Sequence, residues 1–319
     1  MKALVTGAAG FIGSYLVEAL IKKGYKVTCL ARKTSGLKWI EHLDLEYIFC
    51  DLADIESCAD KIQGFDYIFH VAGLTKAVSE KAFFQANAEC TQRLLRASAK
   101  SPGIRRFLYV SSLAAAGPAV DNIPLKEDAP PSPVSFYGKS KLEGERAVLE
   151  YRDTMPVTII RPPAVYGPRD TDLFVMFRMI KAGIFPYWGK CHYSLLYVED
   201  LVQGIILAAE KKEAEGRTFF LSDNMVYTND DIAREISGAL GTKAVKISLP
   251  CALMPLVAFM GEKLSKKGII NQDKVRELRY SNWTCDAGNA RREIGFQPKI
   301  TLREGIKWTA DWYKIHRWL

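Results

Sequence analysis

The sequence predicts an α/β fold in which a doubly wound parallel sheet is followed by a smaller, mostly helical C-terminal lobe. Three observations carry this prediction. Short apolar strands alternate with helical stretches through the first half of the chain. A glycine-rich turn joins the first strand to the first helix. From about Thr228 onward, the pattern is mainly helical with a few short strands.

The first strand and helix are the clearest elements. Lys2–Thr6 is a short apolar strand, and apolar residues recur at helical spacing over Gly13–Lys23 before Gly24 ends the helix. Five more strands are expected at Lys26–Ala31, Leu45–Cys50, Tyr67–Val71, Phe107–Ser111 and Val157–Ile160. Helices are expected over the periodic stretch Phe83–Lys100, from about Ser135 onward, and over Val198–Lys211.

The composition and periodicity of the sequence change at two places, and these changes suggest the domain limits. Residues 117–133 hold five prolines and several acids, which predicts a surface loop. After Arg161-Pro162 the pattern loosens, and residues 167–196 are rich in glycine, proline and aromatic residues. We expect a nucleotide-binding domain formed by residues 1–166 and 197–225, and a substrate-binding lobe formed by residues 167–196 and 226–319.

The charge of the chain does not point to a nucleic-acid partner. The 319 residues have an ordinary composition, with 48% hydrophobic and 25% charged residues and a net charge of +8. Such a charge suits nucleic acid, a membrane surface or an anionic ligand. The basic residues, however, occur as scattered pairs such as Lys22-Lys23 and Arg105-Arg106. We therefore expect solvated basic side chains and a small-molecule partner.

The cysteines and the apolar runs indicate a reduced, cytoplasmic protein. Seven cysteines are widely spaced and form no CxxC pair, which argues against a disulfide framework and against a bound metal. The first apolar run is broken at once by Thr6-Gly7, so it is a strand rather than a signal peptide. The stretch Leu249–Met260 is shorter than the roughly 20 residues that span a bilayer.

The glycine-rich turn is a candidate phosphate-binding loop. Without a Cβ, glycine lets the backbone turn tightly and approach a pyrophosphate, and the helix N-terminus adds unpaired N–H groups and a positive dipole end. The order of strand, glycines and helix is that of a Rossmann dinucleotide site, although the spacing G-x-x-G-x-x-G differs from the common fingerprint in its first gap. The candidate contacts are Thr6, Gly7, Gly10, Phe11, Ile12 and Gly13.

The end of the second strand favours NADP(H) as the cofactor. An acidic residue there would bind the 2′-hydroxyl of NAD, whereas an arginine accommodates the 2′-phosphate of NADP. The sequence lacks the acid and instead reads Arg32-Lys33 after the strand. Arg32 can pair a phosphate through two hydrogen bonds. The alternative is that Arg32 is a solvated loop residue and that the cofactor is NAD.

Tyr137, Lys141 and a serine form the candidate catalytic group. Tyr137 and Lys141 are four residues apart at the start of a predicted helix, so they share one face. A neighbouring ammonium and a cationic nicotinamide would lower the pKa of the tyrosine toward the working range, so that it exchanges a proton with a carbonyl or alcohol oxygen. Ser111 and Ser112 end the fifth strand, where a hydroxyl can hold the substrate oxygen.

These motifs together resemble the extended branch of the short-chain dehydrogenase/reductase superfamily, the NAD-dependent epimerase/dehydratase family. The resemblance covers nearly the whole chain. Its motifs are TGAAGFIG at 6–13, CDLAD at 50–54, HVAG at 70–73, YVSS at 109–112, YGKSK at 137–141, RPPAVYG at 161–167 and YVEDL at 197–201. The family's catalytic serine lies five residues before a glycine, and counting back from Gly117 selects Ser112.

The resemblance implies roles for further residues. It implies that Asn87 supports catalysis, with a helix-packing amide as the alternative, and that Lys141 also binds the nicotinamide ribose. It implies that Asp51 and Leu52 flank the adenine. The remaining implied cofactor contacts are Ala72, Gly73, Pro162 and Val165, together with Tyr137. It also implies a homodimer through helices near residues 83–100 and 136–151.

The substrate is expected to be a relatively apolar carbonyl compound or secondary alcohol. Members acting on nucleotide sugars typically carry an arginine shortly before the YVxD stretch, and residues 191–198 contain none. The stretch 173–188 is rich in Phe, Met, Tyr and Trp, which form a protein core more often than a pocket. The tail residues Trp283–Asp286 and Ala290–Pro298 resemble the 3β-hydroxysteroid dehydrogenase, dihydroflavonol reductase and hopanoid-associated epimerase-like group.

Three hypotheses about the function stay open at this point. The first is an NADP(H)-dependent oxidoreductase, the second a nucleotide-sugar epimerase or dehydratase with tightly bound cofactor, and the third a non-catalytic dinucleotide sensor. The intact Ser112, Tyr137 and Lys141 weigh against the sensor. The stretch Leu249–Met260, beside Lys263, Lys266 and Lys267, is either ordinary core, a border of the pocket, or a contact with a lipid surface.

Overall fold

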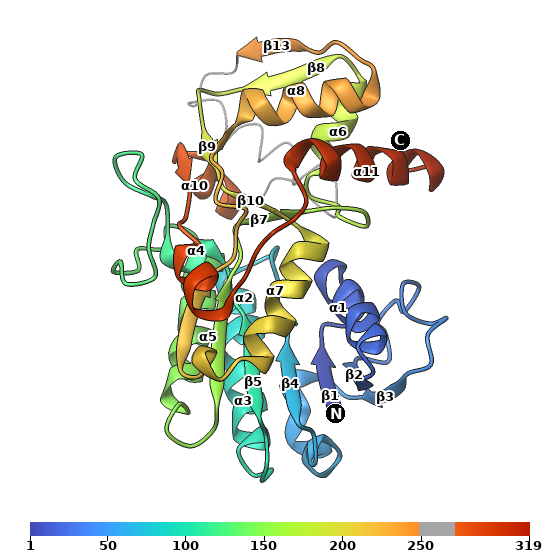
Figure 1. Ribbon diagram of the computed structural model, residues 1–319, viewed down its shortest axis with the longest axis vertical. Helices are drawn as coiled ribbons and strands as arrows, with labels where there is room; N and C mark the ends of the chain where they lie inside the picture. The colour runs from blue at the N-terminus through green and yellow to red at the C-terminus, as the bar shows by residue number, and fades with distance from the viewer. Residues whose placement is uncertain (249–271) are drawn as a thin grey trace.

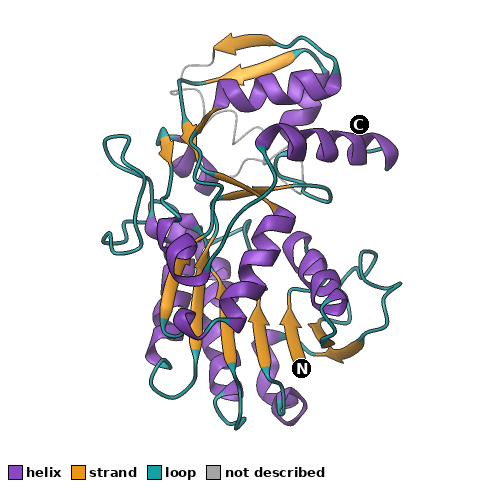
Figure 2. Cartoon of the chain, viewed as in Figure 1, coloured by secondary structure: helices purple, strands orange, loops and turns teal. Residues whose placement is uncertain are grey.

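A seven-stranded parallel sheet forms the centre of the molecule (Figures 1 and 2). The computed structural model describes residues 1–248 and 272–319. The strand order is β11-β6-β5-β4-β1-β2-β3, so β1 and β4 are neighbours although β2 and β3 lie between them in sequence. This is the predicted doubly wound arrangement. The strands are β1 (Lys2–Thr6), β2 (Lys26–Ala31), β3 (Glu46–Phe49), β4 (Tyr67–His70), β5 (Arg106–Val110), β6 (Val157–Arg161) and β11 (Arg217–Phe220).

Six of these strands lie within one residue of their predicted limits, and β1 and β2 match them at both ends. The seventh, β11, is missing from the prediction. It contains only four residues, Arg217–Phe220, which is too short a run for a periodic signal. It forms because its backbone pairs with β6, from Thr158 opposite Arg217 to Arg161 opposite Phe220. A tertiary contact therefore creates this strand.

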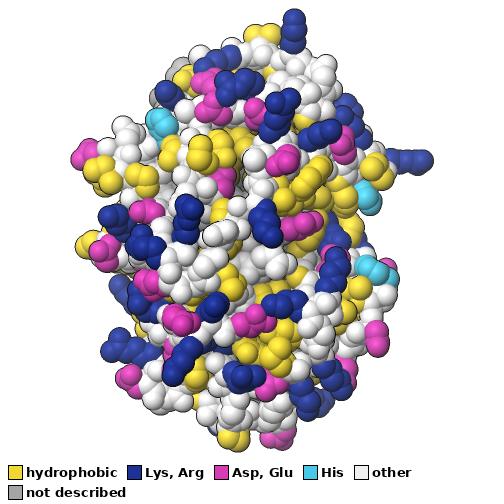
Figure 3. Space-filling model, in the orientation of Figure 1, with side chains coloured by type: hydrophobic (Ala, Val, Ile, Leu, Met, Phe, Trp, Pro, Cys, Tyr) yellow, Lys and Arg dark blue, Asp and Glu magenta, His cyan; other side chains and the backbone are white. Residues whose placement is uncertain are grey.

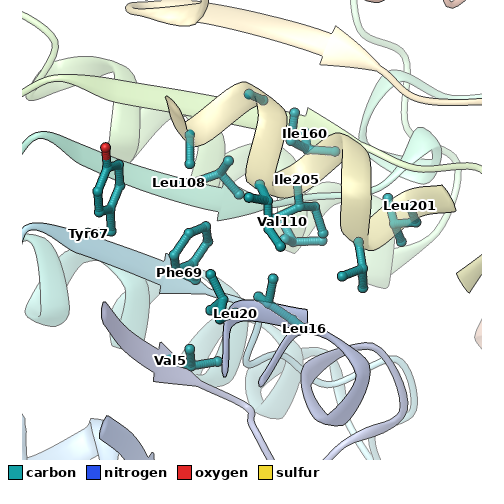
Figure 4. Close-up of a cluster of buried hydrophobic side chains, with 14 of the residues drawn as sticks. Val5, Leu16, Leu20, Tyr67, Phe69, Leu108, Val110, Ile160, Leu201 and Ile205 are labelled. Carbon is teal, nitrogen blue, oxygen red and sulfur yellow. The ribbon is translucent and has the colours of Figure 1, made fainter. Parts of the chain in front are cut away.

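Helices cover both faces of the sheet. On one face lie α1 (Phe11–Lys22) and α7 (Val198–Glu210), and on the other lie η1 (Leu52–Ile62), α3 (Cys90–Ser98) and α5 (Phe136–Glu150). Figure 4 shows the first of these interfaces, where Leu16 of α1 and Ile205 of α7 share a core with Phe69 of β4. Each such fully buried side chain stabilises the fold by roughly 1.5–3 kcal/mol. The packing thus holds the ends of the strands in fixed positions.

The C-terminal lobe has its own core above the sheet in the view of Figure 1. It is built from α6 (Phe174–Lys181), β8 (Ile184–Tyr187), α8 (Asn229–Leu240), β13 (Val245–Ser248) and α11 (Leu302–Ile315). The rings of Phe174 and Phe177 lie 5.0 and 5.2 Å from that of Tyr313 on α11. Phe185 is also buried there. The aromatic stretch therefore contributes to the lobe core, and its composition alone marks no pocket.

The remaining elements of the described residues are short. The helical ones are α2 (Glu80–Phe84), η2 (Gln85–Glu89), α4 (Leu113–Ala116), η3 (Lys212–Ala214), α10 (Gln272–Leu278) and η5 (Ala290–Ile294). The strands are β7 (Ala164–Tyr166), β9 (His192–Tyr193), β10 (Leu195–Tyr197), β12 (Tyr227–Thr228) and β14 (Asn282–Trp283). The proline-rich segment 117–133 is a loop, as predicted, and Leu125 forms an isolated bridge with Cys285.

Four further expectations concern membrane-spanning helices, metal sites, surface charge and residues 249–260. No helix within residues 1–248 and 272–319 is long and apolar enough to cross a membrane. Over the same residues there is no cluster of three or more side chains suited to a metal ion. Figure 3 shows basic and acidic side chains interspersed on the face in view. The stretch Leu249–Met260 and its neighbouring lysines lie outside the described residues.

Candidate active site

The predicted site residues come together at the carboxyl edge of the sheet, where its strand order reverses. Thr6 at the end of β1 lies opposite His70 at the end of β4. The glycine-rich turn and the loop after β4 therefore leave the sheet side by side. Ligands of open parallel sheets bind in the crevice at this kind of position.

The glycine-rich turn needs its glycines for steric reasons. Gly7 has φ +72°, and a Cβ there would lie 2.6 Å from the backbone nitrogen of Ala72. A Cβ on Gly13 would overlap the carbonyl oxygen of Gly7. Any side chain at either position would push the turn away from the loop after β4. The close approach of the two backbones thus depends on the missing side chains.

The first turn of α1 is suited to an anion. Gly10 is the N-cap and supplies no side-chain hydrogen bond, and no acidic residue occupies the first turn. The first N–H groups of the helix and its positive dipole end therefore lack a side-chain partner. Phe11 and Ile12 at the start of α1 are partly buried. These features fit the pyrophosphate of a dinucleotide.

A buried histidine, which the motif analysis did not single out, connects this turn to the candidate catalytic residues. His70 Nε2 lies 2.9 Å from Thr91 Oγ1, whose hydroxyl donates to the carbonyl oxygen of Asn87. His70 Nε2–H must therefore be the donor, and Nδ1 accepts from Thr6 Oγ1 at 2.7 Å. Thr6 Oγ1 in turn accepts from Ala72 N–H at 3.2 Å. Burial lowers the pKa of His70 to about 3, so the ring stays neutral.

The residues expected near the adenosine lie at the same edge of the sheet. Leu30 pairs with Thr6, so Arg32, two residues later, leaves the sheet beside the glycine-rich turn. Arg32 and Lys33 are exposed. Asp51 caps η1 by accepting a 3.0 Å hydrogen bond from Ala53 N–H. The next residue, Leu52, is partly buried. Their roles toward a cofactor stay predictions.

Ser112 and Tyr137 are hydrogen-bonded to each other, although they lie on different elements. Ser112 is the N-cap of α4 and accepts from Ala114 N–H at 3.1 Å. Its neighbour Ser111 is buried, and its hydroxyl finds no hydrogen-bond partner among the described residues. The geometry thus agrees with the choice of Ser112 over Ser111 as the partner of Tyr137.

The expected lowering of the pKa of Tyr137 is wrong for the chain by itself. Burial raises this pKa to about 12, the Ser112 hydrogen bond opposes the shift, and the charges of Glu277 and Asp172 add to it. Lys141 Nζ donates to the carbonyl oxygen of Val110 at 2.7 Å and lies 4.2 Å from the centre of the Tyr109 ring. Burial lowers the pKa of Lys141 to about 7, so its positive charge is weakened at neutral pH.

Asn87 bridges the loop after β4 to α5. Its Oδ1 accepts from Leu74 N–H at 2.8 Å, and its Nδ2 donates to Leu74 O and to Ser140 Oγ, both at 2.9 Å. A Cβ on Gly73 would lie 2.9 Å from Asn87 Oδ1 and 3.6 Å from Lys141 Nζ. Gly73, Asn87 and Lys141 therefore meet at one point. The amide is a bridge between elements here, and its part in catalysis stays a prediction.

The remaining predicted contacts lie beside the end of β5. The carbonyl oxygen of Pro162 accepts from Leu113 N–H at 2.8 Å, so the segment after β6 is joined to α4. Pro162 is thereby close to Ser112, which precedes Leu113 in the chain. Val165 of β7 packs against the core of the α1 and α7 face. The contact of Pro162 and Val165 with a cofactor stays a prediction.

Two buried carboxylates near Tyr137 escaped the motif analysis. Asp273 and Glu277 of α10 lie against the first turn of α5, which carries Tyr137. They are 136 and 140 residues away from Tyr137 along the chain, so no local pattern could associate them with it. Only the docking of α10 on α5 brings them to the site.

Comparison with known proteins agrees with this geometry. The model of the NAD dependent epimerase/dehydratase family matches residues 3–221, more than half of the chain. Ceramide reductase of Caulobacter vibrioides is 31% identical over 329 residues, which cover 99% of this chain and 95% of that protein. The 3 beta-hydroxysteroid dehydrogenase/Delta 5→4-isomerase of Mycobacterium tuberculosis is 27% identical over 338 residues, which cover 98% of this chain and 90% of that protein.

A solved structure supports the fold independently. UDP-glucuronic acid 4-epimerase from Bacillus cereus, in complex with UDP-glucuronic acid and NAD, superposes with a TM-score of 0.80 at 24% identity. The match covers 99% of this chain and all of that one. Family and fold agree with the resemblance found in the sequence. The chain is an NAD(P)-dependent enzyme and belongs to the NAD dependent epimerase/dehydratase family, within the extended short-chain dehydrogenases/reductases.

Proposed function

We propose that this enzyme uses NADP(H) to transfer a hydride to or from the carbon of a carbonyl or secondary alcohol in a relatively apolar substrate. One observation carries the proposal: Tyr137 is hydrogen-bonded to Ser112 at the carboxyl edge of the sheet. Lys141 lies one helical turn after Tyr137 on α5. A phenol, a hydroxyl and an amine so arranged suit proton exchange with a substrate oxygen.

The roles of the side chains follow from their protonation. The nicotinamide, when bound, supplies or accepts the hydride. With a pKa raised to about 12, Tyr137 holds its proton at neutral pH and is ready to donate it to a carbonyl oxygen. The Ser112 hydroxyl holds that oxygen beside Tyr137. Lys141, with a pKa lowered to about 7, carries its charge in only part of the molecules at neutral pH, and a phenolate formed at Tyr137 favours the ammonium.

NADP(H) is favoured by the charges at the end of β2. Arg32 and Lys33 are exposed beside the glycine-rich turn, and no carboxylate follows the strand to repel a 2′-phosphate. Arg32 makes no side-chain hydrogen bond or ion pair with any residue of the described segments, so its guanidinium is available to a phosphate. NAD is the alternative cofactor.

The residues around β10 favour an apolar substrate over a nucleotide sugar. Residues 191–198 contain no arginine that could hold the phosphate of a nucleotide sugar. Two relatives are named for ceramide reduction and for 3 beta-hydroxysteroid dehydrogenation, and both names denote chemistry at an oxygen-bearing carbon of a largely apolar molecule. Burial of such a ligand contributes about 25 cal/mol per Å² of apolar surface. Longer apolar ketones should therefore bind more tightly.

The test is a panel assay that follows NADPH absorbance. The panel contains alicyclic ketones, long-chain ketones, dihydroflavonols, and UDP- and GDP-sugars. A KM that falls as the apolar part of the ketone grows is the expected result. Conversion of a nucleotide sugar without net consumption of NADPH would contradict the proposal and favour the epimerase alternative. Absence of any hydride transfer over the whole panel would contradict the assignment of the reaction itself.

We also propose a homodimer through the helices within residues 83–100 and 136–151. The exposed residues of η2, α3 and α5 are all polar or charged. They are Gln85, Glu89, Arg96, Lys139, Glu143, Arg146 and Glu150. Such an interface would depend on charge pairs and weaken with salt. Light scattering at low and high salt tests it, and a monomer under both conditions would exclude it.

A further inference from the structure

The first turn of α5 is capped from another part of the chain. Phe136 N–H donates to Asp273 Oδ1 at 2.7 Å, and Tyr137 N–H donates to Asp273 Oδ2 at 3.0 Å. Ser135 Oγ accepts from Gly138 N–H at 3.0 Å and donates to Glu277 Oε1 at 2.8 Å. Two carboxylates of α10 therefore bind the first three N–H groups of the helix. Asp273 accepts from the first two directly, and Glu277 is linked to the third through the Ser135 hydroxyl.

Both carboxylates are buried, which makes this contact stronger than an ordinary cap. Asp273 is 8% exposed and Glu277 is 7% exposed. A buried carboxylate needs hydrogen bonds and positive charge to offset its lost hydration. The N-terminus of α5 provides both, because its N–H groups point at Asp273 and its dipole ends there. Hydrogen bonds to a charged acceptor are stronger than those between neutral groups.

The other side of α10 is fixed to the lobe. Val275 is buried and packs with Trp188, which follows β8, and with Leu278 of the same helix. Trp283 Nε1–H of β14 donates to the carbonyl oxygen of Glu277 at 3.2 Å. The helix is thus held between the lobe and α5. A displacement of the lobe at this point would be passed to the backbone of Tyr137.

The charges around Tyr137 come from several elements. Glu277 of α10 pairs with Lys274 at 2.7 Å, and Asp172, which follows β7, pairs with Lys76 of the loop after β4 at 2.5 Å. Arg276 lies 4.0 Å from Asp273. Ser112 is a hydrogen-bond partner of the phenol, and the centre of the Phe83 ring lies 6.1 Å from the centre of the Tyr137 ring. Among these groups, the negative charges of Glu277 and Asp172 disfavour the phenolate.

We propose that Asp273 and Glu277 are positioning residues for Tyr137: docked from the C-terminal lobe, they hold the first turn of α5 in place, and the charge of Glu277 disfavours the phenolate. This inference rests on the proposed function of Tyr137 as the proton donor. Asp273 acts mainly through geometry, because it binds the N–H of Tyr137 itself. Glu277 acts mainly through charge, because it binds the Ser135 hydroxyl beside the first turn of α5 and its charge raises the pKa of Tyr137. Neither residue needs to touch the substrate.

The first experiment measures the titration of Tyr137 without any substrate. The full-length protein is labelled with 3-fluorotyrosine, and the ¹⁹F resonance of residue 137 is assigned by its loss in Tyr137→Phe. Fluorine lowers the pKa of a phenol, which brings the titration into a pH range that a folded protein tolerates. Glu277→Gln removes the charge and retains the shape of the side chain. Its midpoint should lie about 0.5–1 pH unit below that of the unsubstituted protein.

The matched control is Glu46→Gln. Glu46 is the first residue of β3, and its side chain is 57% exposed and pairs with Lys26 at the surface. The same chemical change there should leave the ¹⁹F midpoint of Tyr137 unaltered, because solvent screens the charge. Equal midpoints in Glu277→Gln and Glu46→Gln would overturn the inference.

The second experiment measures amide hydrogen exchange in peptides that cover residues 134–140. Asp273→Asn retains one acceptor oxygen, so one of the two N–H groups loses its partner, and exchange at Phe136 and Tyr137 should become faster than in Glu46→Gln. With any ketone that the panel identifies, kcat should fall about tenfold or more while the Kd of NADPH stays the same. Faster exchange without a change in kcat or in the Tyr137 midpoint would reduce Asp273 to a structural cap and overturn the inference.

The two experiments also separate this inference from the proposed function. If no compound of the panel is reduced or oxidised, the proposed reaction fails, whereas the ¹⁹F midpoint and the exchange rates still decide whether α10 controls Tyr137. If Asp273→Asn does not fold, the Glu277→Gln midpoint decides alone. If Glu277→Gln shifts the midpoint but Tyr137→Phe turns over the ketone normally, Tyr137 is not the proton donor, and the positioning role falls with it.

Discussion

Lys141 Nζ lies 2.7 Å from the carbonyl oxygen of Val110, the last residue of β5. The contact fixes the amine at the carboxyl edge of the sheet, one residue before the serine pair. It also buries the amine, and this burial lowers the pKa of Lys141 to about 7. The protonation of Lys141 should therefore change within the physiological range.

Cofactor affinity should fall as the pH rises through about 7. Below this pH Lys141 is an ammonium that attracts the anionic dinucleotide, and above it Lys141 is neutral, so binding weakens. Titration with NADH, which lacks the ionisable 2′-phosphate, at about pH 6 and about pH 8 measures the effect. Lys141→Met should bind less tightly at the lower pH and show no such dependence. An unsubstituted protein with equal affinity at both pH values would refute the prediction.

Tyr137→Phe should lower kcat by about 10²-fold or more. The substitution removes only the phenol oxygen, which donates the proton to the substrate, and the ring can keep its contact with Phe83. The Kd of NADPH should stay nearly unchanged. Steady-state kinetics and a fluorescence titration together measure both effects. Normal turnover by the Phe variant would mean that another group supplies the proton.

Ser112→Ala and Ser111→Ala form a matched pair. Ser112 is hydrogen-bonded to Tyr137, whereas the buried Ser111 hydroxyl has no partner among the described residues. Ser112→Ala should lower kcat and also destabilise the fold by about 1 kcal/mol, since it removes the cap of α4. Ser111→Ala should leave the unfolding free energy the same or higher. A larger loss of kcat in Ser111→Ala would reverse the assignment of the two serines.

Arg32→Ala should weaken NADPH binding and leave NADH binding nearly unchanged. Arg32 is exposed at the end of β2, and its predicted partner is the 2′-phosphate that only NADPH carries. Loss of a charge-assisted hydrogen-bond set costs roughly 1.5–3 kcal/mol, or about 10- to 150-fold in Kd. Fluorescence titrations with both cofactors measure this. Equal affinity of the unsubstituted protein for NADPH and NADH would contradict the preference.

Gly7→Ala should impair cofactor binding far more than Gly24→Ala. Both glycines have positive φ, of +72° and +81°, so both substitutions carry a backbone strain of about 1–2 kcal/mol. Only at Gly7 would the new Cβ meet the backbone of Ala72, at 2.6 Å, while Gly24 has open space. Thermal unfolding and NADPH titration compare the two. Similar losses in both variants would show that sterics at Gly7 are unimportant.

Much of the sheet could be predicted from the sequence because its signals are local. The limits of β1 and β2 follow from apolar runs bounded by glycines, and the glycine-rich turn between β1 and α1 is recognised from residue types alone. The spacing of Tyr137 and Lys141 likewise places both on one helix face. Counting back from Gly117 selects Ser112, and the structure does join Ser112 to Tyr137.

The tertiary structure decided what depends on distant neighbours. Strand β11 exists because β6 offers its backbone edge, and Phe174 and Phe177 belong to the lobe core because α11 brings Tyr313 against them. In the chain without a cofactor, the pKa of Tyr137 is raised rather than lowered, because burial and the charges of Glu277 and Asp172 outweigh the Ser112 hydrogen bond. Burial and electrostatic fields arise from the packing of remote segments, so no local pattern of residues can encode them.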